Sequence, residues 1–175
     1  MSDPDPLASS MLAGILRHIP AITVFANPLP GSYRRLGSFE APAGVGWSAQ
    51  NRSQLVRLPA AQGEDSRMEV RSPDPACNPY VVALLLMEAG LSGVRDNLPL
   101  PSPSDFDGSL TPAEKRLPQT LGAAIDEAWK SDFIHAVLPE KYLSQYFVQK
   151  GKEFEAYRAA NDPYRYEIER YFDRI

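Results

Sequence analysis

Residues 66–93 of this chain, SRMEVRSPDPACNPYVVALLLMEAGLSG, decide the fold. Polar and apolar side chains alternate over the first seven residues, which predicts a strand with one polar face. Asn78 and Pro79 then supply an N-cap and a proline at the first helical position. The apolar run after them predicts a buried helix that ends near Gly90 or Gly93. A strand followed closely by a buried helix indicates an α+β fold.

Further helices are predicted on the C-terminal side of this segment. They are expected at residues 117–129, 131–138 and 139–160, and a last one, capped by Asp162-Pro163, reaches the C-terminus. Aromatic side chains recur at helical spacing along the third of these helices, and we interpret them as core packing and not as a ligand cage. They are Tyr142, Tyr146, Phe147, Phe154 and Tyr157. The C-terminal part is therefore predicted to be a helical layer.

The N-terminal part is predicted to hold the sheet. Residues 1–10 are expected to be a flexible N-terminus, and the apolar spacing after them predicts a helix that stops before Pro20. Residues 21–75 contain short β-branched or aromatic runs between proline breaks, which favours a small, mostly antiparallel sheet. A surface loop is expected at residues 98–107, where prolines, serines and acids are concentrated.

The composition is that of a soluble globular domain, with 43% apolar and 23% charged residues in a chain of 175. A net charge of −4 is too acidic for a protein whose main task is to bind nucleic acid. The longest apolar run, Val81–Met87, is too short to cross a bilayer, and the acidic start lacks the pattern of a signal peptide. Cys77 is the one cysteine, and His18 and His135 are too few for a three-histidine metal site. We therefore expect a cytoplasmic protein with no disulfide.

Arginine is concentrated in the predicted sheet. Six arginines fall within 38 residues, and no lysine precedes Lys115; they are Arg34, Arg35, Arg52, Arg57, Arg67 and Arg71. Arginine is preferred over lysine where a protein makes planar, two-point contacts with carboxylates or phosphates. A solvated strand with weak surface ion pairs would also place Arg67, Glu69 and Arg71 on one face. The number of arginines nearby favours an anion site instead.

Several arginines around one carboxylate suit phosphoryl transfer, in which the protein mainly positions and stabilises charged oxygens. Glu69, between two arginines in sequence, is a candidate ligand for a hard divalent cation. The residues alone therefore suggest magnesium-assisted phosphoryl chemistry on an acidic small molecule.

Five segments carry a family resemblance. In order they are Asn27-Pro28 with Ser32-Tyr33-Arg34-Arg35-Leu36, then Phe39-Glu40-Ala41-Pro42, Asn51-Arg52-Ser53, RMEVRSPDP at residues 67–75, and Asn78-Pro79-Tyr80. They resemble the C-terminal part of the catalytic domain of the glutamine synthetase family. The resemblance extends over residues 11–175, with an arginine-rich sheet at 21–75 and helices at 78–175. It implies that the sheet is part of a larger catalytic barrel.

The resemblance implies an ATP-dependent glutamate–ammonia ligase. In this family ATP phosphorylates the side-chain carboxylate of glutamate, and ammonia then displaces the phosphate. By position, Arg35 and Arg71 match arginines that bind glutamate, and Arg52 matches one that contacts the transferred phosphoryl group and so the ATP phosphate. Arg57 and Arg67 match arginines on the ATP phosphates. The arginine-rich segment thus corresponds to the family's substrate site.

Two carboxylates complete the implied site. Glu69 matches a ligand of the Mg²⁺ or Mn²⁺ ions that this chemistry uses, and Glu40 matches the flap glutamate that helps to deprotonate the incoming ammonium. Most of the family's metal ligands and its N-terminal domain have no counterpart in this sequence. One carboxylate cannot hold a six-coordinate cation, so we expect the chain to be inactive alone.

Other positions depart from the family pattern. Glu64 stands where a basic residue near the nucleotide is expected, and Thr111 stands near a tyrosine that some members use for adenylylation. His18 is expected at a helix end and not as the family's histidine ligand. Cys77, in a turn before a buried helix, is expected to be a small buried residue.

Part of a barrel would expose strand edges and apolar surface, so we expect self-association or a complementary glutamine synthetase polypeptide as partner. Glutamate, ATP and ammonia are the implied small molecules. An alternative hypothesis is a non-catalytic binding or regulatory module that has kept the fold and the anion site. A fragment with no independent role is a third alternative.

Overall fold

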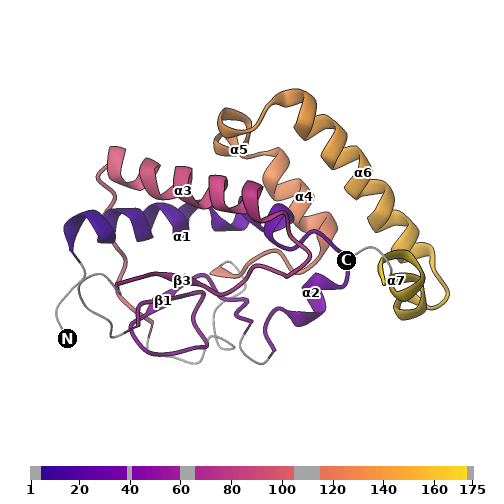
Figure 1. Cartoon of the computed structure of the whole chain (residues 1–175), viewed down its shortest axis with the longest axis horizontal. Helices are drawn as coiled ribbons and strands as arrows, with labels where there is room; N and C mark the ends of the chain where they lie inside the picture. Colours follow the sequence, from indigo (N-terminus) through magenta and orange to yellow (C-terminus); the bar gives the residue numbers. More distant parts are fainter. Residues whose placement is uncertain (1–4, 39–40, 60–65, 105–114, 173–175) are drawn as a thin grey trace.

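The computed structural model describes residues 5–38, 41–59, 66–104 and 115–172. Within these ranges the helices are α1 (Pro6–Ala26), α2 (Ser32–Arg35), α3 (Pro79–Arg95), α4 (Leu121–Trp129), α5 (Asp132–Val137), α6 (Glu140–Ala159) and α7 (Pro163–Tyr171), and the strands are β1 (Trp47–Ser48), β2 (Val56–Arg57) and β3 (Glu69–Val70). Figure 1 shows α1 and α3 side by side above the sheet, with α4, α5 and α6 grouped at the opposite end from the N-terminus. The predicted α+β class is confirmed.

Helix α1 lies at the centre of the core. Leu12, Ile19 and Ile22 are completely buried, and α3 and α4 both pack against this helix. By length and composition alone α1 could cross a membrane, but 61% of its most apolar window is buried inside the molecule, as in a core helix.

The prediction that the first helix stops before Pro20 is wrong. Pro20 lies inside α1, which continues to Ala26. A proline in a helix interior removes one backbone hydrogen bond and costs about 3 kcal/mol. Burial of the turn that follows Pro20, with Val24 fully inaccessible and Phe25 nearly so, offsets this cost.

Glycines bring α1 and α3 into close contact. A Cβ atom at Gly14 of α1 would lie 2.1 Å from the carbonyl oxygen of Ala89, and one at Gly93 of α3 would lie 2.1 Å from that of Ser10. Gly90 and Gly93 were expected to end α3, but both are buried within a helix that runs to Arg95. These two glycines therefore allow α3 to pack closely against α1 and do not terminate α3. The predicted N-cap is confirmed, because Asn78 Oδ1 accepts hydrogen bonds from the backbone N–H groups of Tyr80 and Val81.

The sheet has the order β1-β2-β3. Strand β2 pairs with β3 in the antiparallel sense, and two isolated bridges, Ser38 with Ala41 and Gly44 with Arg116, are antiparallel too. The pairing of β1 with β2 is parallel. The strand expected over residues 66–72 is regular only at Glu69–Val70, and Arg57 lies directly opposite Glu69 in the register.

Three of the C-terminal helices begin where they were predicted to begin. Ser131 caps α5, Pro139 precedes α6, and Asp162 caps α7 with Pro163 at its first position. Two bounds differ from the prediction: α4 begins at Leu121 after the cap residue Thr120 and not at residue 117, and α7 ends at Tyr171 and not at the last residue.

The aromatic side chains of α6 pack as expected. Phe147 is buried, and Tyr146 stacks on Phe25 with ring centroids 4.9 Å apart while its hydroxyl donates to the Val24 carbonyl. The described part of the predicted surface loop, residues 98–104, has no regular structure. It is held at Trp47, whose Nε1 donates to the Pro101 carbonyl. Residues 105–107 of that loop lie outside the described residues.

A buried carboxylate joins α6 to α7. Glu153 accepts hydrogen bonds from Lys150 Nζ at 2.9 Å, from Gln149 Nε2 at 3.0 Å and from the Tyr171 hydroxyl at 3.2 Å. Burial raises the pKa of Glu153, but these hydrogen bonds outweigh it and hold the pKa below its usual value. Arg34 of α2 pairs with Glu167 and donates to the Tyr157 hydroxyl, which fixes α7 against α2.

Candidate functional site

Three arginines surround one carboxylate at the outer strand of the sheet. Arg57 Nη1 lies 3.3 Å from Glu69 Oε2, and Arg71 Nη1 lies 3.8 Å from the same oxygen. Arg67 Nε lies 3.3 Å from the other oxygen, Oε1. The predicted face of Arg67, Glu69 and Arg71 is therefore present, and the pairing of β2 with β3 adds Arg57 to it. We call these four residues the Glu69 cluster.

The cluster differs from a solvated strand face in its burial. The side chains of Arg57 and Arg71 are only 18% and 13% exposed, whereas Arg67 is 54% exposed. Solvent and salt screen charges less at partly buried positions than at exposed ones. Within the described part of the chain, this cluster places three guanidinium groups around one carboxylate. A group of guanidinium side chains at partly buried positions suits the binding of anionic oxygens.

Arg35 belongs to a second group of polar side chains. Its Nη2 donates to Asn27 Oδ1 at 2.9 Å and to the Ser72 carbonyl, and its Nε lies 3.8 Å from the Asp74 carboxylate. Asn27, Ser72 and Asp74 were not among the predicted site residues. A signal was present, because Asn27 precedes Pro28 and Asp74 lies between two prolines, so both are polar residues held in rigid chain segments.

Several buried polar atoms around Arg35 have no hydrogen-bond partner among the described residues. They are Asn27 Nδ2, Tyr33 Oη, Arg35 Nε and Ser72 Oγ. Burial, with a further contribution from Asp74, raises the pKa of Tyr33 far above its usual value, so its hydroxyl stays protonated. The atoms without a partner in this group are buried N–H and O–H groups, whose chemistry suits an anionic oxygen better than a cation.

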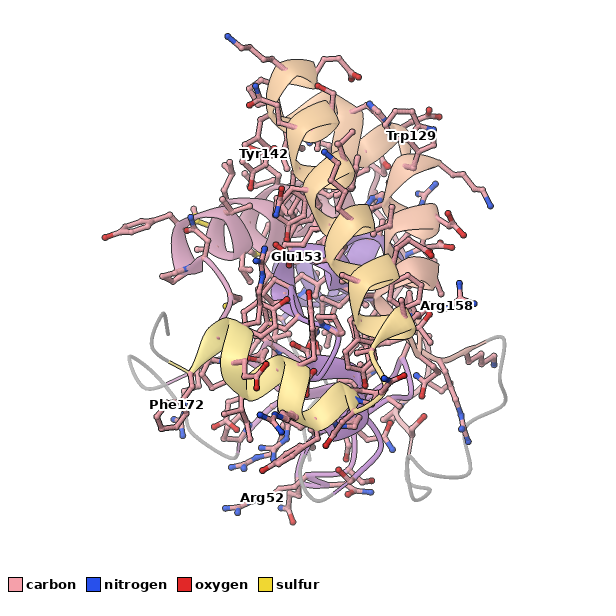
Figure 2. The ribbon with its side chains drawn as sticks, turned by 90° about the vertical axis from the view of Figure 1, so that its right-hand side faces the viewer. Arg52, Trp129, Tyr142, Glu153, Arg158 and Phe172 are labelled. Carbon is pink, nitrogen blue, oxygen red and sulfur yellow. The ribbon has the colours of Figure 1, made fainter. Side chains whose placement is uncertain are left out.

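The two remaining predicted residues are not part of either group as described. Arg52 is exposed on the turn that connects β1 to β2, and Figure 2 shows it at the lower end of the molecule, below α7. Glu40 lies outside the described residues, as do Glu64 and Thr111. The structure thus unites Arg57, Arg67, Arg71 and Glu69 and places Arg35 in the neighbouring group.

The described residues do not fit a metal ion on their own. Among them, no three His, Cys, Asp or Glu side chains gather closely enough to hold one. Glu69 is the carboxylate of the cluster, and both of its oxygens face guanidinium groups. Glu69 could supply at most two of the about six oxygen ligands of a divalent cation, so other carboxylates would have to complete such a site.

His18 and Cys77 take structural positions. The prediction of a helix-end position for His18 is wrong, because α1 continues past it to Ala26. Its ring stacks on Phe133 with centroids 4.1 Å apart, and burial, followed by the charge of Arg17, lowers its pKa. Cys77 is partly buried against the core, and burial raises the pKa of its thiol. Neither environment is that of a metal ligand or an activated nucleophile.

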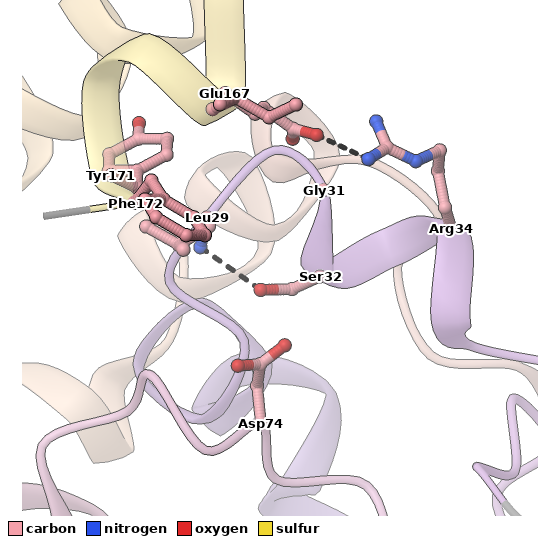
Figure 3. Close-up of a pocket in the computed structure, with 9 residues that line it drawn as sticks. Leu29, Gly31, Ser32, Arg34, Asp74, Glu167, Tyr171 and Phe172 are labelled. Carbon is pink, nitrogen blue, oxygen red and sulfur yellow. Dashed lines mark hydrogen bonds and ion pairs between the residues drawn. The ribbon is translucent and has the colours of Figure 1, made fainter. Parts of the chain in front are cut away.

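A cavity of about 490 Å³ lies between α2 and α7, away from the Glu69 cluster. Figure 3 shows Glu167 reaching from α7 to Arg34 at one side of it, while Tyr171, Phe172 and Leu29 form an apolar wall. Asp74 also lines this cavity, so the cavity borders the Arg35 group.

The sequence of this chain is similar to that of known proteins. The family described as glutamine synthetase, catalytic domain, matches residues 2–171. The glutamine synthetase of Methanosarcina mazei is 40% identical over 172 residues, which is 94% of this chain and 38% of that protein. That of Methanococcus voltae is 38% identical over 86% of this chain and 36% of its own length, and that of Thermus thermophilus is 35% identical over 94% and 38%.

The chain spans a little over a third of the length of the curated relatives that it matches. The match covers the whole described structure except its last residue, and it includes both arginine groups. The chain therefore belongs to the glutamine synthetase family and corresponds to part of its catalytic domain.

Proposed function

We propose that this chain forms the C-terminal part of the active site of a glutamine-synthetase-like, ATP-dependent glutamate–ammonia ligase. The observation that carries the proposal is the Glu69 cluster, in which two largely buried arginines and a third exposed one converge on one carboxylate. Phosphoryl transfer between ATP and a carboxylate gathers negative charge on several oxygens, and fixed guanidinium groups stabilise it.

Different arginines bind different anionic groups of the two substrates, ATP and glutamate. Arg57 and Arg67 hold ATP phosphates, and Arg71 and Arg35 hold the carboxylates of glutamate, with Arg35 kept in place by Asn27 and Ser72. Arg52 contacts the phosphoryl group during transfer. Glu40 accepts the proton that ammonium releases before ammonia attacks the acyl phosphate. The net charge of −4 and the burial of α1 in the core agree with a cytoplasmic enzyme that binds neither nucleic acid nor membrane.

Magnesium or manganese is the one component that this chain cannot hold with its described residues. Bound Mg²⁺ would neutralise charge on the ATP phosphates. Glu69 would be one ligand, and a complementary glutamine synthetase polypeptide would supply the other carboxylates. We therefore propose that the chain by itself does not form glutamine.

A non-catalytic binding or regulatory module is the second candidate. It is favoured by one observation, namely that both oxygens of Glu69 already face guanidinium groups, so this carboxylate is paired without a metal. Such a module would bind an anion or a partner but would gain no activity from a complementary polypeptide.

Reconstitution distinguishes the two candidates. The chain is mixed with the part of the Methanosarcina mazei relative that it does not match, and glutamine formation from glutamate, ammonia and ATP is measured with Mg²⁺. We expect activity in the mixture and none from either component. Arg57→Ala and Arg52→Ala should each lower this activity by about 100-fold or more, because each removes a donor to transition-state charge. The control is Arg158→Ala, whose side chain is 64% exposed on α6. A mixture that binds but forms no glutamine would favour the non-catalytic module.

A further inference from the structure

Helix α3 has the sequence of a fully buried helix, but the described chain covers only one of its sides. Val82, Leu85 and Ala89 are buried against α1. On the other side Tyr80, Leu84, Met87 and Leu91 are 85%, 44%, 64% and 43% exposed. Their spacing of four, three and four residues places them in one stripe along the helix. We call these four residues the α3 outer face.

The outer face is unusual within this molecule. On α6, a helix of similar length, the exposed positions include Lys141, Gln145, Lys152 and Glu155, and Val148 is the exception. The four residues of the outer face are uncharged, and the charged residues of α3, Glu88 and Arg95, are 35% and 62% exposed and form an ion pair at 3.7 Å. A helix that is apolar on all sides is normally buried on all sides. The α3 outer face is therefore typical of a surface that another polypeptide segment covers.

A hollow continues the outer face at the start of α3. A cavity of about 230 Å³ is lined by Asn78 and Val81 of this end of α3, by Tyr142 and Tyr146 of α6, and by Phe25 at the end of α1. Figure 2 shows Tyr142 on the side of α6 on which α3 lies. A stripe of exposed apolar side chains beside a largely apolar hollow is the form of a helix-binding groove, in which a bulky side chain enters the hollow.

We infer that the α3 outer face and this hollow form the docking surface for the complementary part of a glutamine synthetase catalytic domain. This inference rests on the proposed function. The relatives extend to more than twice the length that this chain matches, so they contain ample sequence to cover the face. A stable interface needs about 800 Å² on each partner, which is more than four side chains provide, so the hollow and its rim must belong to it. The four side chains of the outer face are uncharged, as expected for the centre of a permanent contact.

The inference is tested with substitutions on the exposed stripe. Met87→Glu and Leu84→Glu place a carboxylate on the outer face without entering the α1–α3 contact. Val148→Glu, at an equally exposed apolar position on α6 (58%), is the matched control. The tagged chain is co-expressed with the unmatched part of the Methanosarcina mazei relative, and the amount retained with the tag is measured. Circular dichroism melting verifies that each variant is folded.

We expect the unchanged chain and Val148→Glu to retain the complementary polypeptide equally, and Met87→Glu and Leu84→Glu to retain at least tenfold less. Equal retention by all variants would overturn the inference, and so would failure of the unchanged chain to retain the polypeptide. Dimers of the chain alone that Met87→Glu separates would also overturn it in favour of a second copy. A complex that requires the α3 outer face but forms no glutamine would contradict the proposed function alone. Glutamine formation that tolerates Met87→Glu would contradict the docking surface alone.

Discussion

At the scale of single residues, His135 provides a prediction about pH. Its Nε2 lies 3.0 Å from the Trp129 carbonyl and its Nδ1 lies 3.1 Å from a Glu140 carboxylate oxygen. Both partners only accept hydrogen bonds, so the protonated ring, which donates from both nitrogens, fits this position best. The Trp129 carbonyl and then Glu140 therefore raise the pKa of His135 above its usual value near 6.5.

A group whose pKa is raised in the folded state stabilises the protein below its unfolded pKa, and this stabilisation is lost as the pH rises through the folded pKa. We therefore expect His135→Ala to lower the melting temperature more at pH 5.5 than at pH 8.5. Thermal unfolding followed by circular dichroism at the two pH values measures the difference. An equal loss at both values would show that protonation of His135 does not stabilise the fold.

The same scale shows why the Glu69 cluster could be predicted only in part. Alternation along a strand places Arg67, Glu69 and Arg71 on one face, and this needs no knowledge of the rest of the chain. Arg57 joins them because it pairs with Glu69 across two strands, a register that depends on how β2 and β3 meet. The partners of Arg35 lie on two segments that are far apart in sequence, at Asn27 and at Ser72 to Asp74, so their contacts with it follow from the tertiary structure and not from spacing.

At the scale of the elements, the contact between α1 and α3 provides a prediction about stability. We expect Gly14→Ala to destabilise the fold by about 3 kcal/mol or more, above the ordinary cost of overpacking, because the added methyl group would meet backbone atoms that cannot move independently. Gly151→Ala on α6 is the control. Nothing lies within 4 Å of its added Cβ, and it should stabilise the fold by about 0.5–1 kcal/mol through helix propensity. Urea denaturation measures both changes, and similar effects from the two substitutions would refute the close crossing.

Helix boundaries could be predicted where local chemistry decides them. Asn78, Ser131 and Asp162 each accept backbone N–H groups through the side chain, and such caps are visible in sequence. The predicted end of α1 before Pro20 was wrong because burial of α1 by the surrounding helices outweighs the local cost of a proline. The predicted end of α3 at Gly90 or Gly93 was wrong because glycine also occurs where two helices pack closely. The sequence alone does not distinguish this role from helix termination.

At the scale of the whole molecule, the chain is a compact part of a larger catalytic fold. Its core is one continuous cluster of buried side chains, from Leu12 on α1 to Leu143 on α6. The expectation of a partner or of self-association stays a prediction, and the α3 outer face is the surface on which we place it. The arginine groups lie at the sheet, so contact with substrates and docking of a partner would use different surfaces of the molecule.

The central claim is that the Glu69 cluster forms an anion site. Isothermal titration calorimetry of ATP into the pure chain, without metal, tests it most directly. We predict saturable binding that weakens at least tenfold in Arg57→Ala and stays unchanged in Arg158→Ala. Absence of binding heat, or equal affinity of the Arg57→Ala variant, would contradict the claim.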